Sequence, residues 1–586
     1  MVPTKPNRSL AYKDSGFDTL ADALDYAAQG ETGYNFYDDR GELRAVASYC
    51  ELRAQARELA SRLNTLDCPR GARVAIIGET GPMFVRFFFA CQYAGLVPVA
   101  LPADVPMGGH DAYVSQLQRL LQACSASIAV APESHAGFLN EAAKPFDIIA
   151  GTAAAFDALE IDARPIEPLG SDETAYLQYT SGSTQFPRGV EVTQASVMNN
   201  LMEIARYGLK LSAADRMMSW LPLFHDMGLV GFLLLPLATQ LSVDLMSPRT
   251  FAMRPRLWLK ILSENGGTVT SSPPFGYSLC AKRLRAADAE KYDLSKLRAA
   301  CVGAERINPE PLAKFAEVLA PSGFRPEAFL PCYGMAECAL AISFAPLDEP
   351  MNIDVVDKQA MSDNLHAQAV DTDPAQGTQT LSLVDCGALL PSYELSIRDE
   401  SGVELDERHC GRILVRGPSV MCGYFENSEA TKAVLAEDGW FDTGDIGYRI
   451  GNHLVVTARH KDVIIINGRN MWPQDLEVLA DQVHNRRIRN VSAFSAATHD
   501  GDETPVMVVE TRDQDPANCR ALVKELQGLV KLHFGVNAYI DVVEPGTLPR
   551  TSSGKLSRIR TKRDFLQRSA DFCADPTMWK PREAHG

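Results

Sequence analysis

Helical and strand patterns alternate along the chain from Tyr49 onward. Residues 49–66 are amphipathic, 73–78 alternate as a strand does, 83–95 have the pattern of a buried helix and 96–102 that of another strand. Further short apolar runs, each beside a helical pattern, lie at 127–132, 216–223, 241–248 and 299–305. Repeated strand and helix units predict parallel sheets covered by helices on both faces.

The pattern changes in the second half of the chain. Strand-like runs separated by turn residues at 387–417 predict an antiparallel subdomain. From Asp462 a new set of strands and helices is long enough for a small domain with its own core. We expect an α/β fold: a large N-terminal domain, residues 1–461, of two α/β sheet subdomains plus a β-rich part at about 383–460, and a small mobile C-terminal α/β domain, residues 462–586.

One segment fits neither pattern. Between Phe344 and Thr380 the chain is polar, acidic and weakly periodic, and it is longer than ordinary connections in compact domains. It is either a disordered loop or an added functional element.

Composition excludes several classes of protein. A chain of 586 residues, 46% of them hydrophobic, can bury several cores. A net charge of -17 and the lack of a dense basic run argue against nucleic acid as the main partner. The start has no secretory apolar core, and the longest uncharged runs, 87–103 and 227–243, are broken by Gly and Pro, so no export and no membrane span are expected. The 13 cysteines form no C-x-x-C pair and the 11 histidines no metal spacing, which favours a cytoplasmic protein without structural zinc.

The loop "YTSGSTQFPRG" (179–189) follows the strand-like run "AYLQY". Its glycines permit exposed backbone N–H groups, and its hydroxyls are donors suited to phosphate oxygens. These residues are Gly182 and Gly189, with Ser181, Ser183 and Thr184. The patterns G-x-x-x-x-G-K-[ST], G-x-G-x-x-G and G-x-S-x-G are all absent, so neither a common phosphate loop nor a serine hydrolase is indicated. Taken alone, a Ser/Gly-rich surface turn explains this loop equally well.

Further motifs follow this loop in a fixed order. They are "LPLFHDMGLVG" (221–231), "VGAERI" (302–307), "PCYGMAE" (331–337), "GRILVRGPSVMCGYF" (411–425), "WFDTGDIG" (440–447), "ARHKDVIIINGRNMWPQDLE" (458–477) and "LPRTSSGKLSR" (548–558). The series resembles the adenylate-forming superfamily of acyl-CoA synthetases, peptide-synthetase adenylation domains and luciferases, from about Thr19 to Phe565. The forms "QYTSGST..PRGV" and "KDVIIINGRNMWPQDLE" are similar to the fatty acyl-AMP ligase subgroup. Members of that subgroup carry an insertion after the Y-G-x-A-E motif, which corresponds here to about 344–381.

The resemblance implies that a carboxylate attacks the α-phosphate of ATP and releases pyrophosphate. The transferring group then needs hydrogen-bond donors, a metal and a cation. Thr180 to Gly189, with Arg188, would wrap the pyrophosphate, and Glu337 and Thr184 would hold Mg²⁺, a hard cation that takes few carboxylates. Without the resemblance, Glu337 would be a carboxylate in the first turn of a helix. Asp445 would accept the ribose hydroxyls, although a "TGD" sequence is also an ordinary turn.

The rest of the nucleotide set is also implied by the resemblance. Its members are Gly303, Ala304, Glu305, Cys332, Tyr333, Gly334, Met335 and Ala336. Tyr333 would stack on the adenine, whereas a buried aromatic is more often plain core.

Four further positions carry roles in the resemblance. Lys555 in "RTSSGK" would approach the carboxylate and the α-phosphate, since a compact mobile charge suits a loop that closes over a transition state. Arg459 would reach ribose or phosphate, and Lys461 would be the interdomain hinge. His225 would orient the carboxylate or gate the thiol entrance, although a lone His is usually structural. The apolar stretch 227–237 would line an acyl tunnel or serve the core.

The chain departs from the common motif forms at three positions. Gln185 replaces a glycine, Arg188 a lysine and Ala336 a threonine. Arginine keeps the positive charge but presents a planar fork instead of a point, so phosphate contact with altered geometry is expected at Arg188.

Three functions are compatible with the sequence. The first is a fatty acyl-AMP ligase that uses ATP and Mg²⁺ and passes the acyl group to the phosphopantetheine thiol of an acyl carrier protein. The second is a long- or medium-chain acyl-CoA ligase; the insertion favours the first, because in relatives it is thought to restrain the movement of the C-terminal domain. The third is a nucleotide-binding regulatory protein without catalysis, against which the presence of Glu337, Asp445 and Lys555 argues.

Overall fold

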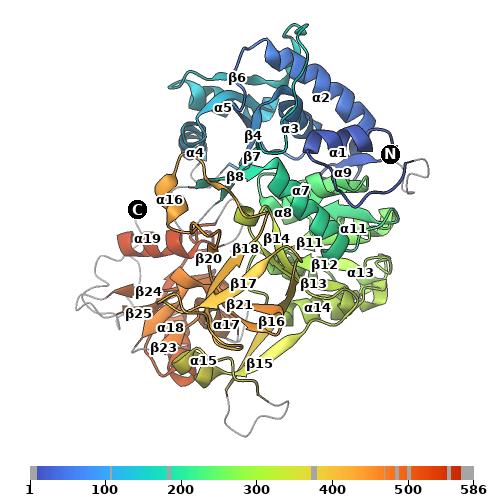
Figure 1. The fold of residues 1–586 in the computed structure, drawn as a ribbon. Helices are drawn as coiled ribbons and strands as arrows, with labels where there is room; N and C mark the ends of the chain where they lie inside the picture. Colours follow the sequence, from blue (N-terminus) through green and yellow to red (C-terminus); the bar gives the residue numbers. More distant parts are fainter. Residues whose placement is uncertain are drawn as a thin grey trace.

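The computed structural model describes residues 10–105, 109–180, 187–370, 379–466, 469–481, 483, 488–497, 503–550 and 556–568. Two large sheets and a smaller C-terminal unit make up the molecule (Figure 1). The α/β class with parallel sheets, a β-rich part and a separate C-terminal unit is confirmed.

The upper lobe in Figure 1 is built on a seven-stranded sheet in the order β19-β8-β7-β4-β3-β5-β6. Its strands are β3 (Arg73–Ile77), β4 (Val97–Leu101), β5 (Ala126–Ala131), β6 (Ile149–Thr152), β7 (Thr174–Thr180), β8 (Arg188–Thr193) and β19 (Gly423–Tyr424). The strands from β7 to β6 pair in parallel, and β8 runs antiparallel to β7 and to β19. Along β3, Val74 and Ile76 join one hydrophobic cluster while Ala75 and Ile77 join another, so both faces of the sheet are covered.

Helices of this lobe begin and end at recognisable signals. They are α1 (Leu20–Ala27), α2 (Tyr49–Asn64), α3 (Pro82–Ala94), α4 (Gly109–Ala123), α5 (Ala136–Ala143), α6 (Ala153–Asp157) and α7 (Gln194–Glu203). Ser48 and Glu51 form a capping box at the start of α2, and Gly95 ends α3 in the left-handed conformation. Helix α3 is apolar on all sides and is buried between α2 and the sheet.

The second sheet has 14 strands, in the order β17-β18-β20-β21-β16-β14-β13-β12-β11-β9-β10-β1-β2, with β15 beside β16. In chain order they are β1 (Gly33–Tyr37), β2 (Leu43–Ser48), β9 (Arg216–Ser219), β10 (Ser242–Met246), β11 (Val269–Ser272), β12 (Ala299–Val302), β13 (Phe329–Gly334), β14 (Ala341–Phe344), β15 (Ile353–Asp357), β16 (Thr380–Leu389), β17 (Glu394–Arg398), β18 (Gly411–Arg416), β20 (Phe441–Ile450) and β21 (His453–Arg459). The helices of this region are α8 (Asp226–Leu229), α9 (Leu235–Ala238), α10 (Pro248–Met253), α11 (Arg256–Asn265), α12 (Pro274–Arg283), α13 (Ala286–Ala289), α14 (Pro309–Leu319), α15 (Lys358–Asn364) and α16 (Ser428–Lys432).

Strand β13 joins the two halves of this sheet. Its first residues pair in parallel with β12, as in Phe329 with Ala300. Its last residues pair antiparallel with β14, as in Cys332 with Phe344. The β-rich part predicted from the sequence is therefore continuous, through hydrogen bonds, with the parallel sheet, and the "PCYG" motif lies where the pairing changes.

The C-terminal unit has its own sheet and core. Its elements are β22 (Ile464–Ile466), β23 (Arg469–Met471), α17 (Pro473–Asp481), β24 (Ile488–Ala497), β25 (Glu503–Thr511), α18 (Pro516–Phe534), β26 (Tyr539–Val543) and α19 (Arg558–Arg568). Leu476, Val509, Leu526 and Ile540 belong to one buried cluster of this unit. A second, smaller cluster surrounds Phe565.

The polar segment after Phe344 is an added structural element in its described part. Strand β15 pairs antiparallel with β16, and α15 follows it directly. Val356 and Met361 are buried there in a cluster with Tyr448. Because these buried apolar side chains anchor a short strand and a short helix, the disordered-loop alternative is wrong for the described residues of the segment. Residues 371–378 lie outside the described part.

Both long uncharged runs are in the interior. The helix at 82–94 and the stretch around 227–238 are buried in the main core. Of the described helices, none has the length and apolar character needed to cross a bilayer.

Candidate active site

One cavity of about 680 Å³ collects most of the predicted site residues. Those that line it are Thr180, His225, Gly303, Ala304, Glu305, Cys332, Tyr333, Gly334, Met335, Ala336, Glu337, Asp445 and Arg459. They come from β7 of the upper lobe, from the carboxyl ends of the parallel strands of the second sheet, and from β20 and β21. Ligands of open α/β sheets commonly bind at such strand ends.

At the polar end of the cavity, Asp445 forms a hydrogen bond and an ion pair. It accepts a hydrogen bond of 2.7 Å from the Tyr333 hydroxyl and lies 2.9 Å from Nε of Arg459, its ladder partner on β21. Burial raises the pKa of Asp445, with the Arg459 charge opposing that rise. Burial likewise raises the pKa of Tyr333 well above its usual value, so the phenol keeps its proton. The arrangement places a carboxylate and a phenol side by side in the cavity wall.

Two glycines of the motifs are required by this geometry. Gly444, beside Asp445, has a φ of +72°, which side-chain-bearing residues rarely adopt. A Cβ on Gly334 would lie 1.9 Å from the carbonyl oxygen of Leu340, so only glycine allows β13 to approach the turn before β14 this closely.

Glu337 lies in a short 3-10 turn, η6 (Ala336–Cys338), directly after the "PCYGM" strand. Its Oε1 accepts a hydrogen bond of 2.9 Å from the Tyr424 hydroxyl. Burial raises the pKa of Glu337, and the Tyr424 hydroxyl and the Arg459 charge oppose the rise. Among the described residues, no group of three or more His, Cys, Asp or Glu side chains could hold a metal. The buried carboxylate of Glu337, with Asp226 also lining the cavity, fits Mg²⁺, which takes one or two carboxylates and keeps substrate phosphates as its other ligands.

The base of the predicted phosphate loop is a hairpin. Thr180 on β7 and Arg188 on β8 are ladder partners, and Gly189 faces Tyr179 so closely that a Cβ there would lie 2.9 Å from the Tyr179 ring. Arg188 and Gly189 are not among the cavity-lining residues. The Arg188 guanidinium carbon instead lies 5.0 Å from the ring centroid of Tyr424. Ser181, Gly182, Ser183, Thr184, Gln185 and Lys555 lie outside the described residues.

His225 lies at the mouth of the apolar part of the cavity. It caps α8, with its Nδ1 3.4 Å from the Met227 amide and 2.5 Å from Oδ1 of Asp226. Met227 and Asp226 also line the cavity. The histidine is therefore held by its own helix while its ring remains beside the cavity.

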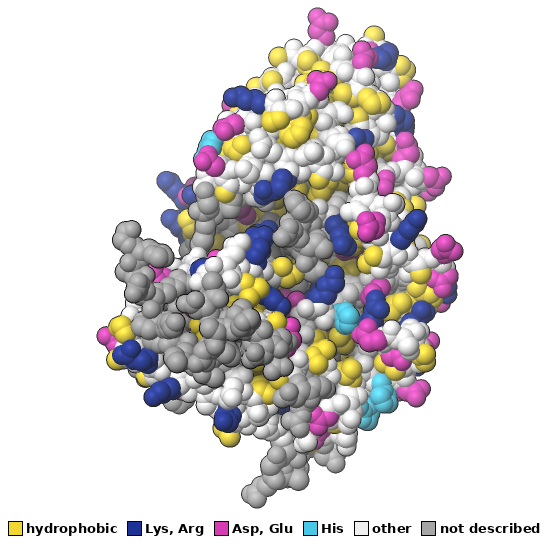
Figure 2. Space-filling view, turned by 90° about the vertical axis from the view of Figure 1, so that its left-hand side faces the viewer, with side chains coloured by type: hydrophobic (Ala, Val, Ile, Leu, Met, Phe, Trp, Pro, Cys, Tyr) yellow, Lys and Arg dark blue, Asp and Glu magenta, His cyan; other side chains and the backbone are white. Residues whose placement is uncertain are grey.

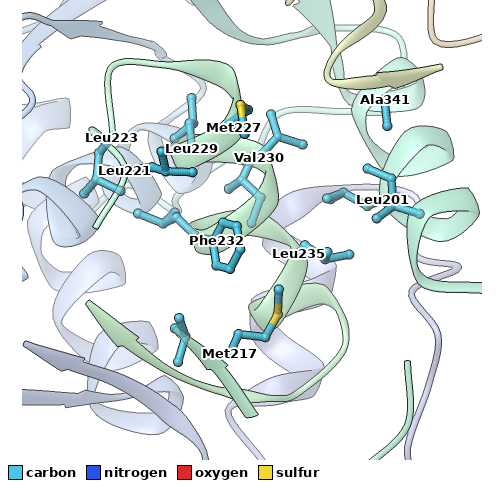
Figure 3. Packing of buried hydrophobic residues seen from close by; sticks show 14 of the residues in the cluster. Leu201, Met217, Leu221, Leu223, Met227, Leu229, Val230, Phe232, Leu235 and Ala341 are labelled. Carbon is cyan, nitrogen blue, oxygen red and sulfur yellow. The ribbon is translucent and has the colours of Figure 1, made fainter. Parts of the chain in front are cut away.

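Behind His225 the chain forms α8, a π-helical turn η3 (Val230–Leu234) and α9 in direct succession. Figure 3 shows side chains of this segment, among them Val230, Phe232 and Leu235, grouped with Leu201 of α7 and Met217 of β9. The apolar part of the cavity is lined by Ile204, Leu209, Met217, Phe224, Gly231, Phe232, Leu235, Leu340, Ala341 and Phe344. This wall suits an aliphatic chain.

The C-terminal unit closes the cavity on its remaining side. Gln474, Glu477, Asn490, Arg550 and residues 556–559 line it. Arg306, next to the "VGAE" motif, pairs with Asp475 of α17 at 2.6 Å. Within the C-terminal unit, Arg558 pairs with Glu477 at 2.6 Å.

On the face shown in Figure 2, Lys and Arg side chains gather where the upper lobe meets the rest of the molecule, although the chain as a whole has a net charge of -17.

Sequence reasoning missed Tyr424, Arg306 and Asp475. All three stand inside or beside quoted motifs, "MCGYF", "VGAERI" and "MWPQDLE", but no residue spacing connects them. Only the fold brings Tyr424 to Glu337 and Arg306 to Asp475.

Comparison with known proteins agrees with this site. The model of the AMP-binding enzyme family matches residues 29–425. A putative acyl-CoA synthetase of Caulobacter vibrioides is 42% identical over 97% of this chain and 98% of its own length. The medium-chain-fatty-acid–[acyl-carrier-protein] ligase JamA of Moorena producens is 30% identical over 95% of this chain and 96% of its own length. A solved structure from work on fatty acyl-adenylate ligases from E. coli and L. pneumophila has 42% identity and a TM-score of 0.90, and the match covers 96% of this chain and 100% of that one.

The chain belongs to the AMP-binding enzyme family, within the adenylate-forming superfamily. It is an ATP-dependent adenylating ligase of the fatty acyl-AMP ligase type, as the motif forms predicted.

Proposed function

We propose that the protein activates a free fatty acid with ATP, forming acyl-adenylate and pyrophosphate, and then transfers the acyl group to the phosphopantetheine thiol of an acyl carrier protein. The observation that carries the proposal is the two-ended cavity. One end presents Asp445, Tyr333 and Glu337, and the other is walled by aliphatic and aromatic side chains. A nucleotide and an acyl chain can thus meet within one cavity.

At the nucleotide end we assign roles by chemistry and motif. Tyr333 faces the adenine, the Asp445 carboxylate accepts the ribose hydroxyls, and Arg459 reaches ribose or phosphate. Residues 180–189 wrap the pyrophosphate, and Lys555 approaches the attacking carboxylate. Glu337 and Thr184 hold Mg²⁺, which would neutralise charge on the phosphates when bound.

The fatty acid occupies the apolar end. His225 lies between the two ends and orients the carboxylate, while the chain extends along η3 and α9. The names of JamA and of the solved fatty acyl-adenylate ligases support a fatty acyl substrate.

The choice of acceptor is supported by contacts of the insertion. Nζ of Lys358, at the start of α15, lies 3.7 Å from the ring centroid of Phe534 at the end of α18. The Ser362 hydroxyl donates to the carbonyl oxygen of Asn470 at 2.8 Å, and the Asn470 amide donates back to the Ser362 carbonyl at 3.3 Å. We propose a domain boundary between 1–461 and 462–586, with these contacts opposing the rotation that CoA-dependent thioester formation would need.

The test uses the wild-type chain with a fatty acid, ATP and Mg²⁺. We expect fatty-acid-dependent release of pyrophosphate and an acyl-adenylate detectable by mass spectrometry. A chase with phosphopantetheinylated carrier protein should then yield acyl-carrier, while an equal chase with CoA should yield little acyl-CoA. Efficient acyl-CoA formation would replace the carrier with CoA as the acceptor, and no fatty-acid-dependent pyrophosphate release with any chain length would refute the fatty acyl substrate.

A further inference from the structure

Tyr424 touches two residues that the adenylation chemistry needs, although it does not line the cavity itself. Its hydroxyl donates to Oε1 of Glu337 at 2.9 Å, and the guanidinium carbon of Arg188 lies 5.0 Å from the centroid of its ring. Glu337 belongs to the β13–η6 segment of the second sheet, whereas Arg188 begins β8 of the upper sheet. The Tyr424 side chain therefore contacts residues of both sheets beside the polar end of the cavity.

The backbone holds Tyr424 in this position from both sides. Strand β19 pairs antiparallel with β8, Tyr424 opposite Val190, and the Phe425 amide donates to the Gly189 carbonyl at 2.8 Å. On the other side the Met421 amide donates to the Glu337 carbonyl at 2.7 Å. Tyr424 is only 7% exposed, so its ring has little freedom to leave.

The hydroxyl gives Glu337 a donor and leaves its second oxygen available. A hydrogen bond to one carboxylate oxygen restricts the rotation of the side chain and so fixes the direction in which the other oxygen points. Among the described residues, Tyr424 is the side chain that donates to Oε1, and none donates to Oε2. Outer partners of this kind orient metal-binding carboxylates.

The ring explains the arginine at position 188. A planar guanidinium stacks on an aromatic face, whereas a lysine ammonium is a strongly hydrated point charge. With its guanidinium carbon 5.0 Å from the Tyr424 ring centroid, Arg188 lies at the start of β8, opposite Thr180 of β7.

We propose that Tyr424 is a positioning residue that sets the Glu337 carboxylate and the Arg188 guanidinium relative to one another, so that the metal and the pyrophosphate of ATP are received together. The inference rests on the proposed function insofar as Glu337 is taken as the metal carboxylate. The Tyr424 hydroxyl serves metal binding, and its ring serves binding of the ATP phosphates through Arg188.

The experiment separates the two halves of the side chain. Tyr424→Phe removes the hydroxyl and keeps the ring, and Tyr424→Leu removes both. Arg188→Lys keeps the positive charge but replaces the planar guanidinium group with an ammonium group. Calorimetric binding of ATP without divalent cation, and Mn²⁺ binding in the presence of ATP followed by electron paramagnetic resonance, are measured for each full-length variant. Tyr448→Phe is the matched control, because it removes a 2.6 Å hydrogen bond from a buried tyrosine to Asp354, outside the cavity.

We expect Tyr424→Phe to weaken Mn²⁺ binding by about 10- to 100-fold, the usual cost of removing an outer partner. Because the Tyr424 hydroxyl also interacts with Arg188, metal-free ATP binding should weaken in Tyr424→Phe as well, but less than in Tyr424→Leu. Tyr424→Leu and Arg188→Lys should each weaken metal-free ATP binding by about 2- to 30-fold, and the double variant by no more than the larger single effect. The half-saturating Mg²⁺ concentration for pyrophosphate release should rise in Tyr424→Phe while kcat at saturating Mg²⁺ changes less.

Unchanged Mn²⁺ binding in Tyr424→Phe would overturn the inference, even if thermal stability fell as it does in Tyr448→Phe. So would fully additive effects of Tyr424→Leu and Arg188→Lys on ATP binding. Neither binding measurement requires a fatty acid, so failure of the proposed substrate would be seen separately, as absent fatty-acid-dependent pyrophosphate release in the wild type.

Discussion

The hydroxyl of Tyr333 donates to the carboxylate of Asp445 at 2.7 Å, joining residues 112 positions apart in the chain. One belongs to the strand at which the parallel sheet turns antiparallel, the other to β20 of the β-rich part. The polar end of the cavity thus depends on docking of the two halves of the large sheet, and not on one contiguous loop.

Replacing Asp445 should impair ATP binding more than turnover. Asp445→Asn removes the charge that pairs with Arg459 and weakens acceptance of the ribose hydroxyls, so we expect KM for ATP to rise by about 10- to 100-fold, as for loss of a charge-assisted hydrogen bond. Steady-state pyrophosphate release against ATP concentration measures this. Asp442→Asn is the control, since Asp442 lies on the same strand as Asp445, does not line the cavity and pairs with Arg412 of β18. Equal effects in both variants would contradict a specific role.

Lys555→Ala should abolish most adenylation without unfolding the protein. A cation that meets charge developing at the α-phosphate acts in the transition state, so we expect kcat for acyl-adenylate formation to fall by about 100-fold or more. The melting temperature should stay near that of the wild type, because substitutions outside a packed core usually change stability little. Lys562→Ala, in α19, is the control. A Lys555→Ala enzyme with wild-type kcat would remove the residue from the mechanism.

A larger residue at position 231 should shorten the preferred acyl chain. Gly231 lines the cavity, and a Cβ there would make ordinary contact, 3.4 Å from Cδ2 of Leu340, so the backbone accepts a side chain. In Gly231→Leu the ratio of kcat/KM for long over short fatty acids should fall by about 10- to 100-fold, the scale of one methylene group in an apolar pocket. Gly137→Leu is the matched control, because a Cβ there has nothing within 4 Å and the residue does not line the cavity. An unchanged chain-length profile would locate the acyl chain elsewhere.

Weakening the insertion contacts should permit CoA to act as acceptor. Lys358→Ala removes the cation above the Phe534 ring, and a contact of about 1–2 kcal/mol shifts a two-state equilibrium by about 5- to 30-fold. We expect acyl-CoA formation from fatty acid, ATP and CoA to rise accordingly, with adenylation unchanged. Lys144→Ala, an exposed lysine of the upper lobe, controls for loss of charge. No gain in acyl-CoA in Lys358→Ala combined with Ser362→Ala would show that the insertion does not decide the acceptor.

Acid stability should depend on Asp215. Burial alone would raise its pKa, but hydrogen bonds from Arg298 and Thr268 outweigh burial and hold the pKa below the ordinary value of 3.8. A depressed carboxyl pKa contributes stability above that ordinary value and loses it as pH falls through the lower folded-state value. Asp215→Asn should therefore cost about 2–4 kcal/mol of unfolding free energy at pH 7, and the difference from wild type should shrink below pH ~4. Denaturant titrations across pH measure this, with exposed Asp172→Asn as the control.

Much of the fold could be predicted because local patterns dominate it. The runs at 73–78, 96–102 and 127–132 became β3, β4 and β5 with boundaries shifted by a residue or so. The elements β15 and α15 could not be predicted, since their anchoring residues Val356 and Met361 are too few to set a period. The continuity of the β-rich part with the parallel sheet also depends on non-local pairing, as between Cys332 and Phe344.

The site likewise contains residues that the sequence motifs predicted and residues that only the fold brings together. Motif order brought together Tyr333, Glu337, Asp445 and Arg459, all of which line one cavity. The order of the motifs did not indicate that the Arg188 guanidinium lies over an aromatic ring. Tyr424 is more than two hundred positions away in the sequence, and the pairing of β19 with β8 brings it to Arg188. Under the role proposed for Tyr424, the arginine at position 188 has its physical reason in a different motif.

The change of partners along β13 also has a consequence for how the molecule comes apart. A strand that hydrogen-bonds to β12 on one side and β14 on the other cannot release either neighbour without exposing its own amides, so the parallel and antiparallel halves should open as one cooperative unit. Amides of Cys332 and Tyr333 should then exchange with solvent only in that large opening, while β24, β25 and β26, which pair only among themselves in the described chain, can open on their own. The nucleotide strand would be among the last parts to lose its structure, with the C-terminal sheet already open.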